Sequence, residues 1–530
     1  MTPFSNALIL PQLVHSRGAS SEGDRPYLAE IGGPWLSYAE VDTAARRWAK
    51  ALGELGASSG QRVAVMLPTS INSMLLWLAC GWLRTYEVPI HVEYRGVILR
   101  HILNNSGADI AVVGERFVDA IWGVQDELQT LKKVIVVSAA GGNDSAWRTQ
   151  VPSRWKGRVI SASELTAEEY PADEGPNYWD IGSVVYTSGT TGPAKGVMVP
   201  WRQFYKHGEI IFPLKDVDTS DTFYCPLPLS HIAGRVAIYN MTLAGGKALL
   251  RERFSIEAFW SDIEQYHCTC GLLIGSIAEM LWRQPPSEAD IRTPLRNVLM
   301  GPLIPQVEEF KARFGVRVRT QFGMTETTAP LVSNVENDWV LANAQSCGRV
   351  LHGFQCRVAD ENDEPLGPGL VGELLIRSDE PWLIMSGYWG DPENTAKAFR
   401  NQWFHTGDAF RYDADGNFYF VDRIRDTIRR RGENISTFFV EQAIAEHAAI
   451  AECAVVGVDS SFTEQEIHAF VVPKPGAQII AAQVQEFLSA KLPAFMIPHF
   501  WTVIDALPRT ATQRVRKVEL RQLALAEKRE

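Results

Sequence analysis

Length and hydrophobic pattern together predict an α/β protein of more than one domain. The chain has 530 residues, which is more than a single hydrophobic core accommodates. In its first part, segments with the apolar spacing of amphipathic helices alternate with short β-branched runs. This alternation favours a mainly parallel sheet covered by helices.

Three helical patterns are each followed by a strand-like run. The pairs are Trp35 to Gly56 with Arg62 to Leu67, Asn72 to Leu83 with Val88 to Val92, and Val97 to Asn104 with Ala108 to Val113. The stretch from Ser138 to Pro176 is polar and rich in Gly, Asn and Glu, so a surface excursion is predicted there. The apolar, β-branched run from Ile181 to Tyr186 then predicts a buried strand.

Composition excludes several classes of protein. With 46% hydrophobic and 21% charged residues, the chain has the composition of a typical globular protein. A net charge of −11 argues against nucleic-acid binding through a broad basic face. The longest apolar run, Met74 to Leu83, is too short to span a bilayer, and the N-terminus has no secretory pattern. Seven scattered cysteines without a C-x-x-C pair suit a reducing compartment, so we expect a cytoplasmic protein.

The stretch after the strand ending at Tyr186 has the composition of a phosphate-binding loop. It reads T-S-G-T-T-G-P-A-K-G from Thr187 to Gly196. Glycines let backbone N–H groups approach a ligand closely, hydroxyls add short donors, and Lys195 adds a mobile positive charge. The loop is not of the Walker A type, because Gly192 is followed by a proline. A plain connecting loop without a ligand is the alternative.

Two later motifs offer groups that suit a nucleotide. The segment T-Q-F-G-M-T-E-T, from Thr320 to Thr327, combines a ring for stacking, a hydroxyl donor and a carboxylate that could bind Mg²⁺. Its structural alternative is a helix N-cap at Thr325 with Glu326 in the first helical turn. The segment W-F-H-T-G-D ends at Asp408, whose carboxylate can accept two hydrogen bonds from ribose hydroxyls; a simple turn is the alternative.

In their order and amino-acid sequence, these motifs resemble those of the adenylate-forming superfamily, in its acyl-CoA ligase branch. Such enzymes use ATP to activate a carboxylate as acyl-AMP and then transfer the acyl group to a thiol. The resemblance implies a large multi-layer N-terminal α/β domain with a β-rich subdomain, over residues 1–422. A small, mobile C-terminal α+β domain over residues 423–530 would rotate about a hinge near Arg425.

The resemblance also implies roles for individual residues. Phe322 would stack on adenine, Thr325 would contact the α-phosphate, and Glu326 would hold Mg²⁺ together with Thr190. The implied nucleotide site as a whole consists of Thr187, Ser188, Gly189, Thr190, Thr191, Lys195, Gly301, Phe322, Gly323, Thr325, Asp408 and Arg423. His231 would lie beside the acyl pocket. The implied catalytic residues are His231, Thr325, Glu326 and Arg514. The alternative for His231 is a core residue or a helix cap.

Coenzyme A is the acceptor that the resemblance favours. The loop V-D-R-I-R-D-T-I-R-R-R-G-E-N-I-S, from Val421 to Ser436, matches the family's hinge and the loop that lines its pantetheine tunnel. The implied CoA-binding residues are Gly432, Glu433, Arg429, Arg430 and Arg431. Guanidinium groups suit the oxygens of the CoA 3′-phosphate, but a run of arginines can equally be a solvated surface.

The last motif departs from the family pattern. Leu507 to Leu520 reads L-P-R-T-A-T-Q-R-V-R-K-V-E-L, with Gln513 and Arg514 where the family has glycine and lysine. In the family that lysine bridges the substrate carboxylate and the α-phosphate during adenylation. A guanidinium is planar and wider than an ammonium, and a misplacement of about 1 Å can slow a reaction on the order of a hundredfold. Lys517 is the nearest substitute, at the cost of rearranging the loop.

The sequence therefore predicts an enzyme that converts acyl-AMP and CoA to acyl-CoA, with ATP-dependent adenylation weak or lost. A separate adenylating enzyme would then supply the acyl-AMP. The alternatives are a complete ligase that also uses ATP and Mg²⁺, a ligase to a carrier protein, and a non-catalytic protein that binds acyl-adenylates. The substrate is a small carboxylic acid or its adenylate. A bulky apolar acid is one option, with Trp201, Phe204, Phe223, Tyr239, Leu303 and Leu331 as pocket walls or simply as core.

Overall fold

The computed structural model describes most of the chain as two compact units. It describes residues 4–138, 145–173, 175–187, 194–287, 290–333, 346–423, 428–430, 433–435, 437–459, 465–489, 492, 496–509 and 515–527. Within these, the first unit contains the chain up to Gln355 together with Arg377–Phe399. The second unit contains Cys356–Ile376 and the chain from Arg400 onward.

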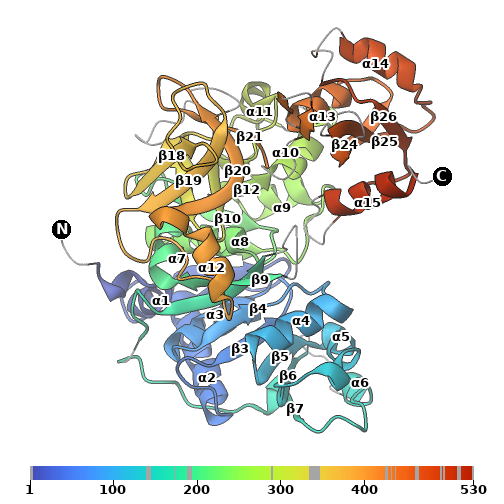
Figure 1. The fold of residues 1–530 in the computed structure, drawn as a ribbon. Coiled ribbons are helices and arrows are strands. Elements are labelled where there is room, and N and C mark those ends of the chain that lie inside the picture. Colours follow the sequence, from blue (N-terminus) through green and yellow to red (C-terminus); the bar gives the residue numbers. More distant parts are fainter. Residues whose placement is uncertain are drawn as a thin grey trace. The chain divides into compact units, whose positions relative to one another are not determined.

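A seven-stranded sheet opens the first unit, as the alternating pattern predicts (Figure 1). Its strand order is β7-β6-β5-β3-β4-β8-β9, and all neighbours are parallel except β8 and β9. The strands are β3 (Arg62–Met66), β4 (Tyr86–Pro89), β5 (Ile110–Gly114), β6 (Lys133–Val137), β7 (Arg158–Ser161), β8 (Ile181–Thr187) and β9 (Lys195–Pro200). The helices of this region are α1 (Leu10–Gly18), α2 (Tyr38–Glu54), α3 (Ile71–Trp82), α4 (Gly96–Ser106), α5 (Val118–Trp122) and α6 (Ser145–Arg148).

The three predicted helix–strand pairs and the strand to Tyr186 are confirmed. The predicted surface excursion is partly wrong, because it contains the edge strand β7. Only the last two residues of β7 are buried, so the segment lacks the apolar run that marks an interior strand. The capping box of α2, between Ser37 and Glu40, accounts for the position at which that helix begins.

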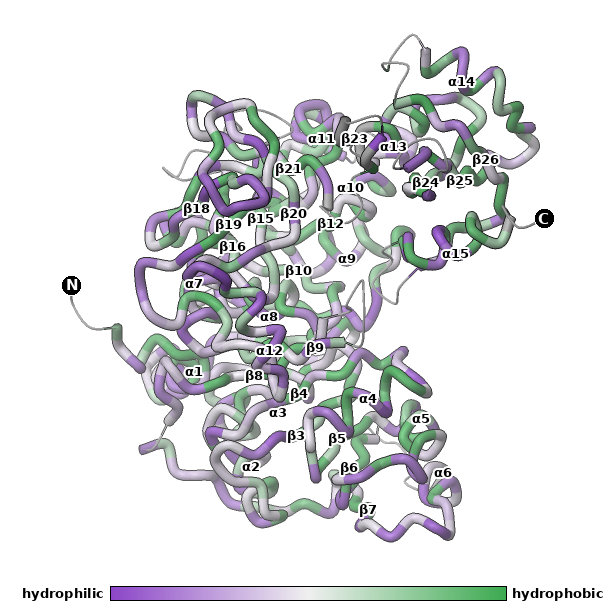
Figure 2. The backbone as a smooth tube through the Cα atoms, viewed as in Figure 1, coloured by the Kyte–Doolittle hydropathy of each residue, from purple (hydrophilic) through white to green (hydrophobic). Residues whose placement is uncertain are grey.

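A second seven-stranded sheet has the order β14-β13-β12-β10-β11-β1-β2 and is parallel except for β2. Its strands are β1 (Pro26–Glu30), β2 (Leu36–Ser37), β10 (Thr222–Cys225), β11 (Lys247–Leu250), β12 (Cys270–Ile274), β13 (Asn297–Gly301) and β14 (Arg317–Arg319). The interior strands β10 to β13 are apolar along most of their length, and the tube is largely green where Figure 2 labels β12. That is expected of a parallel sheet covered on both faces.

Helices lie between the two sheets and on their outer faces. α3, α7 (Trp201–Ile211) and α8 (Ile232–Ala244) form the middle layer, in which α3 touches β4 and β1 while α8 touches β10 and β11. In this layer Trp77 stacks on Trp201 at a centroid distance of 5.3 Å. α4 and α5 cover the outer face of the first sheet. Beyond the second sheet, α10 (Gly275–Trp282) packs on β12 and α11 (Val307–Phe314) on β14, with α9 (Phe259–Gln265) preceding β12.

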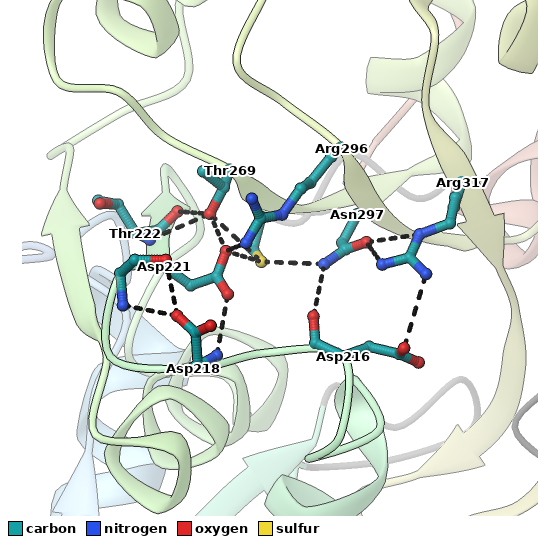
Figure 3. Close-up of polar contacts among 10 residues, drawn as sticks. Asp216, Asp218, Asp221, Thr222, Thr269, Arg296, Asn297 and Arg317 are labelled. Carbon is teal, nitrogen blue, oxygen red and sulfur yellow. Dashed lines mark hydrogen bonds and ion pairs between the residues drawn. The ribbon is translucent and has the colours of Figure 1, made fainter.

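The amino ends of the second sheet are joined by a buried polar network (Figure 3). Asp221 precedes β10, is fully buried, and accepts hydrogen bonds from the Thr269 hydroxyl, from Arg296 Nη2 at 2.7 Å and from the Asp218 amide at 3.0 Å. Each of these residues lies just before a strand or in the turn leading to one. The network therefore ties the amino edge of the sheet together, at the end opposite to the carboxyl ends of its strands.

Asp221→Asn is expected to lower the free energy of unfolding by about 1–3 kcal/mol, because Thr269 and Arg296 then lose the charged acceptor that the buried Asp221 carboxylate provides. Urea denaturation measures this loss. Arg296→Ala is the control: its half-exposed side chain should account for less than about 1 kcal/mol. An Asp221→Asn protein as stable as the wild type would show that the network adds nothing to stability.

A short antiparallel sheet completes the first unit. It consists of β15 (Gln321–Met324), β16 (Thr328–Val332) and β17 (Arg349–Val350), and α7 packs on β16. Residues 325–327 form the turn between β15 and β16. The alternative of a helix N-cap at Thr325 is therefore wrong, because the chain folds back on itself as a hairpin. α12 (Pro392–Ala398) also belongs to this unit.

The second unit is built from three small sheets. One has the order β18 (Phe354–Ala359), β19 (Gly372–Ser378), β20 (Phe404–Tyr412) and β21 (Phe418–Arg423). β22 (Ile428–Arg430) pairs with β23 (Glu433–Ile435), and β24 (Ile450–Asp459), β25 (Gln465–Pro473) and β26 (Phe500–Val503) form the third sheet. Its helices are α13 (Thr437–Ala445), α14 (Ala481–Ser489) and α15 (Lys517–Glu527). Among the described residues of the chain, no helix has the length and apolar composition needed to cross a bilayer.

Candidate active site

Several predicted residues converge at the carboxyl ends of the parallel strands in the first unit. Gly301 ends β13, and β14 ends at Arg319, immediately before the hairpin that carries Phe322. His231 closes the loop that leads from β10 into α8. Ligand sites of open α/β sheets lie at this edge, whereas the Asp221 network occupies the other edge. These residues therefore lie at the edge of the sheet where such sites occur.

The predicted phosphate loop connects two paired strands. β8 ends at Thr187 and β9 begins at Lys195, and these two residues are partners in the antiparallel ladder. Near its carboxyl end, β8 is held by α4, because the Tyr186 hydroxyl donates to Asn105 Oδ1 at 2.6 Å. The loop residues between the strands lie outside the described part of the chain; they include Ser188, Gly189, Thr190 and Thr191.

Tyr388 links the phosphate-loop strand to the predicted metal ligand. The Lys195 Nζ lies 4.8 Å from the centroid of the Tyr388 ring, and the Tyr388 hydroxyl donates to Glu326 Oε1 at 3.2 Å. Burial and the nearby Glu326 carboxylate raise the pKa of Tyr388, so its hydroxyl stays protonated and serves as a donor. Tyr388 is held in place by a β-bridge to Val197. Our sequence reasoning missed Tyr388, because no local motif marks it.

The hairpin that carries Phe322 to Glu326 is fixed from both sides. The Thr325 carbonyl accepts a hydrogen bond from Gln203 Nε2 at 2.8 Å, and the Glu326 carbonyl accepts one from the Met385 amide at 2.8 Å. A Cβ atom on Gly323 would lie 2.2 Å from the Thr328 carbonyl oxygen, so only glycine fits there. Phe322 is half-buried, while Glu326 is only 7% exposed. The tertiary contacts therefore fix the backbone of the hairpin from which Phe322 and Glu326 project.

His231 occupies the N-cap position of α8 but makes no side-chain capping hydrogen bond. Its ring lies 5.8 Å from that of His91, which follows β4, and burial lowers the pKa of His91. The preceding loop is anchored by Arg235, whose Nε donates to the Leu229 carbonyl. Two histidines thus lie together at the carboxyl edge, and a catalytic role for His231 stays a prediction.

The aromatic residues suggested as walls of an apolar acid pocket are core residues. Trp201, Phe204, Phe223 and Tyr239 are at most 1% exposed. Trp201 and Phe204 pack on Trp77 in the middle helix layer, and the Tyr239 hydroxyl donates to the Leu8 carbonyl at 2.7 Å. Leu331 is also fully buried, in β16. These residues therefore belong to the hydrophobic core and are not walls of an acid pocket.

In the second unit, Asp408 and Arg423 are neighbours across two strands. Asp408 lies in β20 and pairs in register with Arg423 in β21, so the alternative of a simple turn at T-G-D is wrong. The preceding Gly407 has a φ of +69° and donates its amide to Glu373 Oε1 at 2.9 Å. Asp408 itself is buried, and its amide donates to the Thr406 hydroxyl at 3.0 Å. The two residues that the resemblance assigns to ribose thus come from adjacent strands.

An ion-pair cluster braces the segment that leads into β20. Asp363 Oδ1 lies 2.8 Å from Arg400 Nη2, and His405 Nδ1 lies 2.9 Å from Glu373 Oε2. Glu373 also accepts the Gly407 amide, so the cluster and the backbone before Asp408 share one acceptor. Chiefly because of its hydrogen bond to Arg400, the pKa of Asp363 is lowered to about 2.

This cluster predicts a loss of stability in acid. Because the pKa of Asp363 is lower in the folded protein than its usual 3.8, its stabilising effect is complete above that value and disappears as the pH falls through about 2. Asp363→Asn should therefore be less stable than the wild type near pH 5, and the difference should shrink towards pH 2. Thermal unfolding midpoints over this range measure it. A difference that does not change with pH would contradict the assignment.

The residues predicted to bind CoA are described only in part. Arg430 is buried and its Nη2 lies 2.7 Å from Glu466 Oε2, so its guanidinium already has an anionic partner. β22 and β23 pair antiparallel with Arg430 opposite Glu433. The side chains of Arg429 and Glu433 lie outside the described residues, as do Arg425, Arg431 and Gly432 entirely. The side chain of Arg423 is likewise not described.

Arg514 and Gln513 lie outside the described residues, but the stem of their loop is described. Arg509 and Val515 form an antiparallel bridge, and the Arg516 amide donates to the Pro508 carbonyl at 2.8 Å. At the start of α15, Lys517 Nζ lies 2.8 Å from Glu441 Oε1 and donates to the Thr437 hydroxyl at 2.5 Å. The ammonium group of the nearest lysine is therefore already bound within the second unit.

Comparisons with known proteins agree with this architecture. The model of the AMP-binding enzyme family matches residues 16–389, and that of the AMP-binding enzyme C-terminal domain matches residues 440–514. The crotonobetaine/carnitine–CoA ligases of Salmonella heidelberg (strain SL476) and Salmonella typhimurium (strain LT2) are each 29% identical over 501 residues, covering 92% of this chain and 93% of theirs.

Two crystal structures share the fold. ATP-bound MatB from Rhodopseudomonas palustris has a TM-score of 0.84 at 24% identity, over 97% of this chain and 98% of its own. The anthranilate CoA ligase AuaEII in complex with anthranoyl-AMP has a TM-score of 0.82 at 20% identity, over 100% and 99%. Because the family models match the large and the small domain in chain order, the protein belongs to the AMP-binding enzyme family. Its relatives are acyl-CoA ligases.

Proposed function

We propose that this protein converts an acyl-AMP and CoA into an acyl-CoA and AMP, and that ATP-dependent adenylation is weak or lost. The observation that carries the proposal is Arg514, which stands, by the resemblance of its flanking residues, at the position of the adenylation lysine. The contacts of Lys517 with Glu441 and Thr437 support it, since they would have to break before Lys517 could act instead.

The proposed step is an acyl transfer. The thiol sulfur of CoA attacks the acyl carbon of acyl-AMP, the bond from that carbon to the phosphate oxygen breaks, and AMP leaves with the electron pair while the thiol proton is released. We assign adenine to Phe322, the α-phosphate to Thr325 and the ribose to Asp408 and Arg423. Gly301, Gly323, Thr187 and Lys195 complete the nucleotide site together with the loop residues.

The second half-reaction needs a different arrangement of the small domain from the first. We place the boundary between residues 1–422 and 423–530, with Arg425 as the pivot and the loop at Gly432 lining the CoA tunnel. The adenylation lysine of related enzymes is used in the first arrangement only, so its replacement leaves the second half-reaction intact. The seven cysteines are all free, which fits the cytoplasmic location that we propose.

ATP and Mg²⁺ enter only if adenylation is retained. Among the described residues no cluster of three or more His, Cys, Asp or Glu side chains surrounds a metal position. Mg²⁺ in nucleotide sites usually has one or two protein carboxylates, with phosphates and water completing its shell. Glu326, fixed by Tyr388, is a carboxylate of that kind. A bound Mg²⁺ would neutralise charge on the phosphates, and Thr190 is its second proposed ligand.

The experiment supplies CoA with a panel of acids plus Mg-ATP, or with the matching synthetic acyl-adenylates, and follows acyl-CoA by mass spectrometry. Product from the acyl-adenylates alone is the expected result. Comparable product from both substrates would make the protein a complete ligase. Tight binding of acyl-adenylates without product would make it a binding protein, and product only with a phosphopantetheinyl carrier protein in place of CoA would identify a carrier-protein ligase.

A further inference from the structure

Arg319 is a buried cation without a hydrogen-bonded partner among the described residues. It ends β14, is 3% exposed, and makes no hydrogen bond or ion pair with any described residue. Burial lowers the pKa of its guanidinium to about 10, so the group still carries its charge at neutral pH. A buried charge without a hydrogen-bonded counterion is costly, and proteins normally pair it. Its retention here leaves a place for an anion that no described residue supplies.

His207 and Gln321 form a second incompletely paired group. Gln321 Nε2 lies 2.9 Å from His207 Nε2, while Gln321 Oε1 and His207 Nδ1 are buried without a partner among the described residues. Burial lowers the pKa of His207 to about 4, so the ring is neutral. Whichever way the amide is turned, the pair keeps one free donor and one free acceptor. Such a pair can orient a polar group that enters beside it.

Arg319 and Gln321 are directed to the same side of the chain. They flank Thr320, whose backbone is paired with Ser333, and side chains two residues apart on an extended segment share a face. His207, on α7, lies on that side because it contacts Gln321. The carboxylate of Asp216, in the loop after α7, acts on Arg319 by charge alone. The three polar side chains therefore lie on one side of the chain entering β15, next to α7.

These side chains lie next to the proposed adenylate site in the chain, on the other face of the strand. Gln321 directly precedes Phe322, and successive side chains of a strand point to opposite faces. The neighbouring part of α7 is apolar, since Ile210, three residues after His207, packs on Ala329 and Val332 of β16.

We propose that Arg319, with His207 and Gln321, selects an acid that carries a second anionic group, a dicarboxylic acid being the simplest case. The inference rests on the proposed function, because it assigns the far end of the same acyl site. A second carboxylate would give Arg319 its missing counterion and accept a hydrogen bond from the His207–Gln321 pair. The same charge disfavours a quaternary ammonium such as that of carnitine, so this substrate class differs from the one named for the Salmonella relatives.

The test uses binding alone, so it does not depend on adenylation or thiolation. Non-hydrolysable acyl-sulfamoyladenosines are prepared from dicarboxylic acids of three to six carbons, from apolar isosteres with isopropyl in place of the far carboxylate, and from a trimethylammonium acid. Calorimetry should show the best dicarboxylic compound binding about a hundredfold more tightly than its isostere, and the ammonium compound most weakly. If none of the compounds binds, the proposed function itself fails, which is a separate outcome.

Arg319→Met separates ligand recognition from folding. If the cation serves a ligand, its removal should leave the melting temperature of the free protein unchanged or higher, because an uncompensated buried charge is lost. The preference for the dicarboxylic compound should also fall to within about threefold of the isostere. Gln321→Leu should reduce the same preference by about tenfold.

Arg317→Met is the matched control, two residues earlier in the same strand. Arg317 donates to Asn297 Oδ1 at 2.7 Å, so its loss should lower the melting temperature and leave the preference among the compounds unchanged. Binding of the compounds without preference for the second carboxylate would overturn the inference. So would a marked drop in the melting temperature of Arg319→Met with an unchanged preference, since that would assign Arg319 to folding.

Discussion

Arg514→Lys is expected to raise the rate of ATP-dependent acyl-AMP formation on the order of a hundredfold. Conversion of supplied acyl-AMP to acyl-CoA should change by less than about threefold, because that half-reaction does not use this side chain. A lysine ammonium is compact and sits on a flexible stem, whereas a guanidinium is planar and needs more room between a carboxylate and a phosphate. The two activities should therefore separate in one substitution.

Release of pyrophosphate from ATP in the presence of the acid measures the first activity, and acyl-CoA formed from acyl-AMP measures the second. Gln513→Gly is the informative companion, because glycine restores backbone freedom without changing the cation. Lys517→Met tests the remaining route: with its contacts to Glu441 and Thr437 broken, stability should fall, whereas adenylation should not. A wild-type enzyme that already adenylates as fast as Arg514→Lys would contradict the proposal.

Arg235→Met is expected to lower the free energy of unfolding by about 3–5 kcal/mol. Arg235 is 2% exposed and Glu87 is fully buried, and they form a two-pronged ion pair in which Nη2 lies 2.8 Å from Oε1. The Ser183 hydroxyl donates to the same carboxylate at 2.8 Å. Removal of the guanidinium leaves the Glu87 charge buried with only this hydroxyl as partner.

Chemical denaturation of the full chain measures the effect, and the double substitution Glu87→Met with Arg235→Met is the control. Because both charges are then absent, most of the lost stability should return. Arg235 also holds the Leu229 carbonyl in the loop before His231, so binding of acyl-adenylates should weaken in the single variant. A loss below about 1 kcal/mol in Arg235→Met would show that the pair is not an anchor of α8.

Much of the fold could be predicted because its signals are local. The helix over Tyr38–Glu54 and the strand over Arg62–Met66 follow from apolar spacing and from the cap at Ser37. The strand β7 escaped prediction because only its last two residues are buried, at a sheet edge, and it therefore has no long apolar run. The turn at Thr325 reads equally well as a helix start, since hydroxyl and carboxylate side chains suit both, and only the pairing of β15 with β16 decides between them.

For the candidate site, the sequence by itself determined the motifs to which we assign the nucleotide, the order in which they follow one another, and the presence of an arginine at position 514. These are properties of contiguous residues. Only the tertiary structure decided that Tyr388 joins Lys195 to Glu326, and that Arg319 is buried without a hydrogen bond or ion pair to any described residue. Burial and pairing depend on which helices and strands pack together, because the partners of a side chain come from residues far apart in the chain. A local sequence pattern therefore cannot show whether a buried charged side chain has a partner.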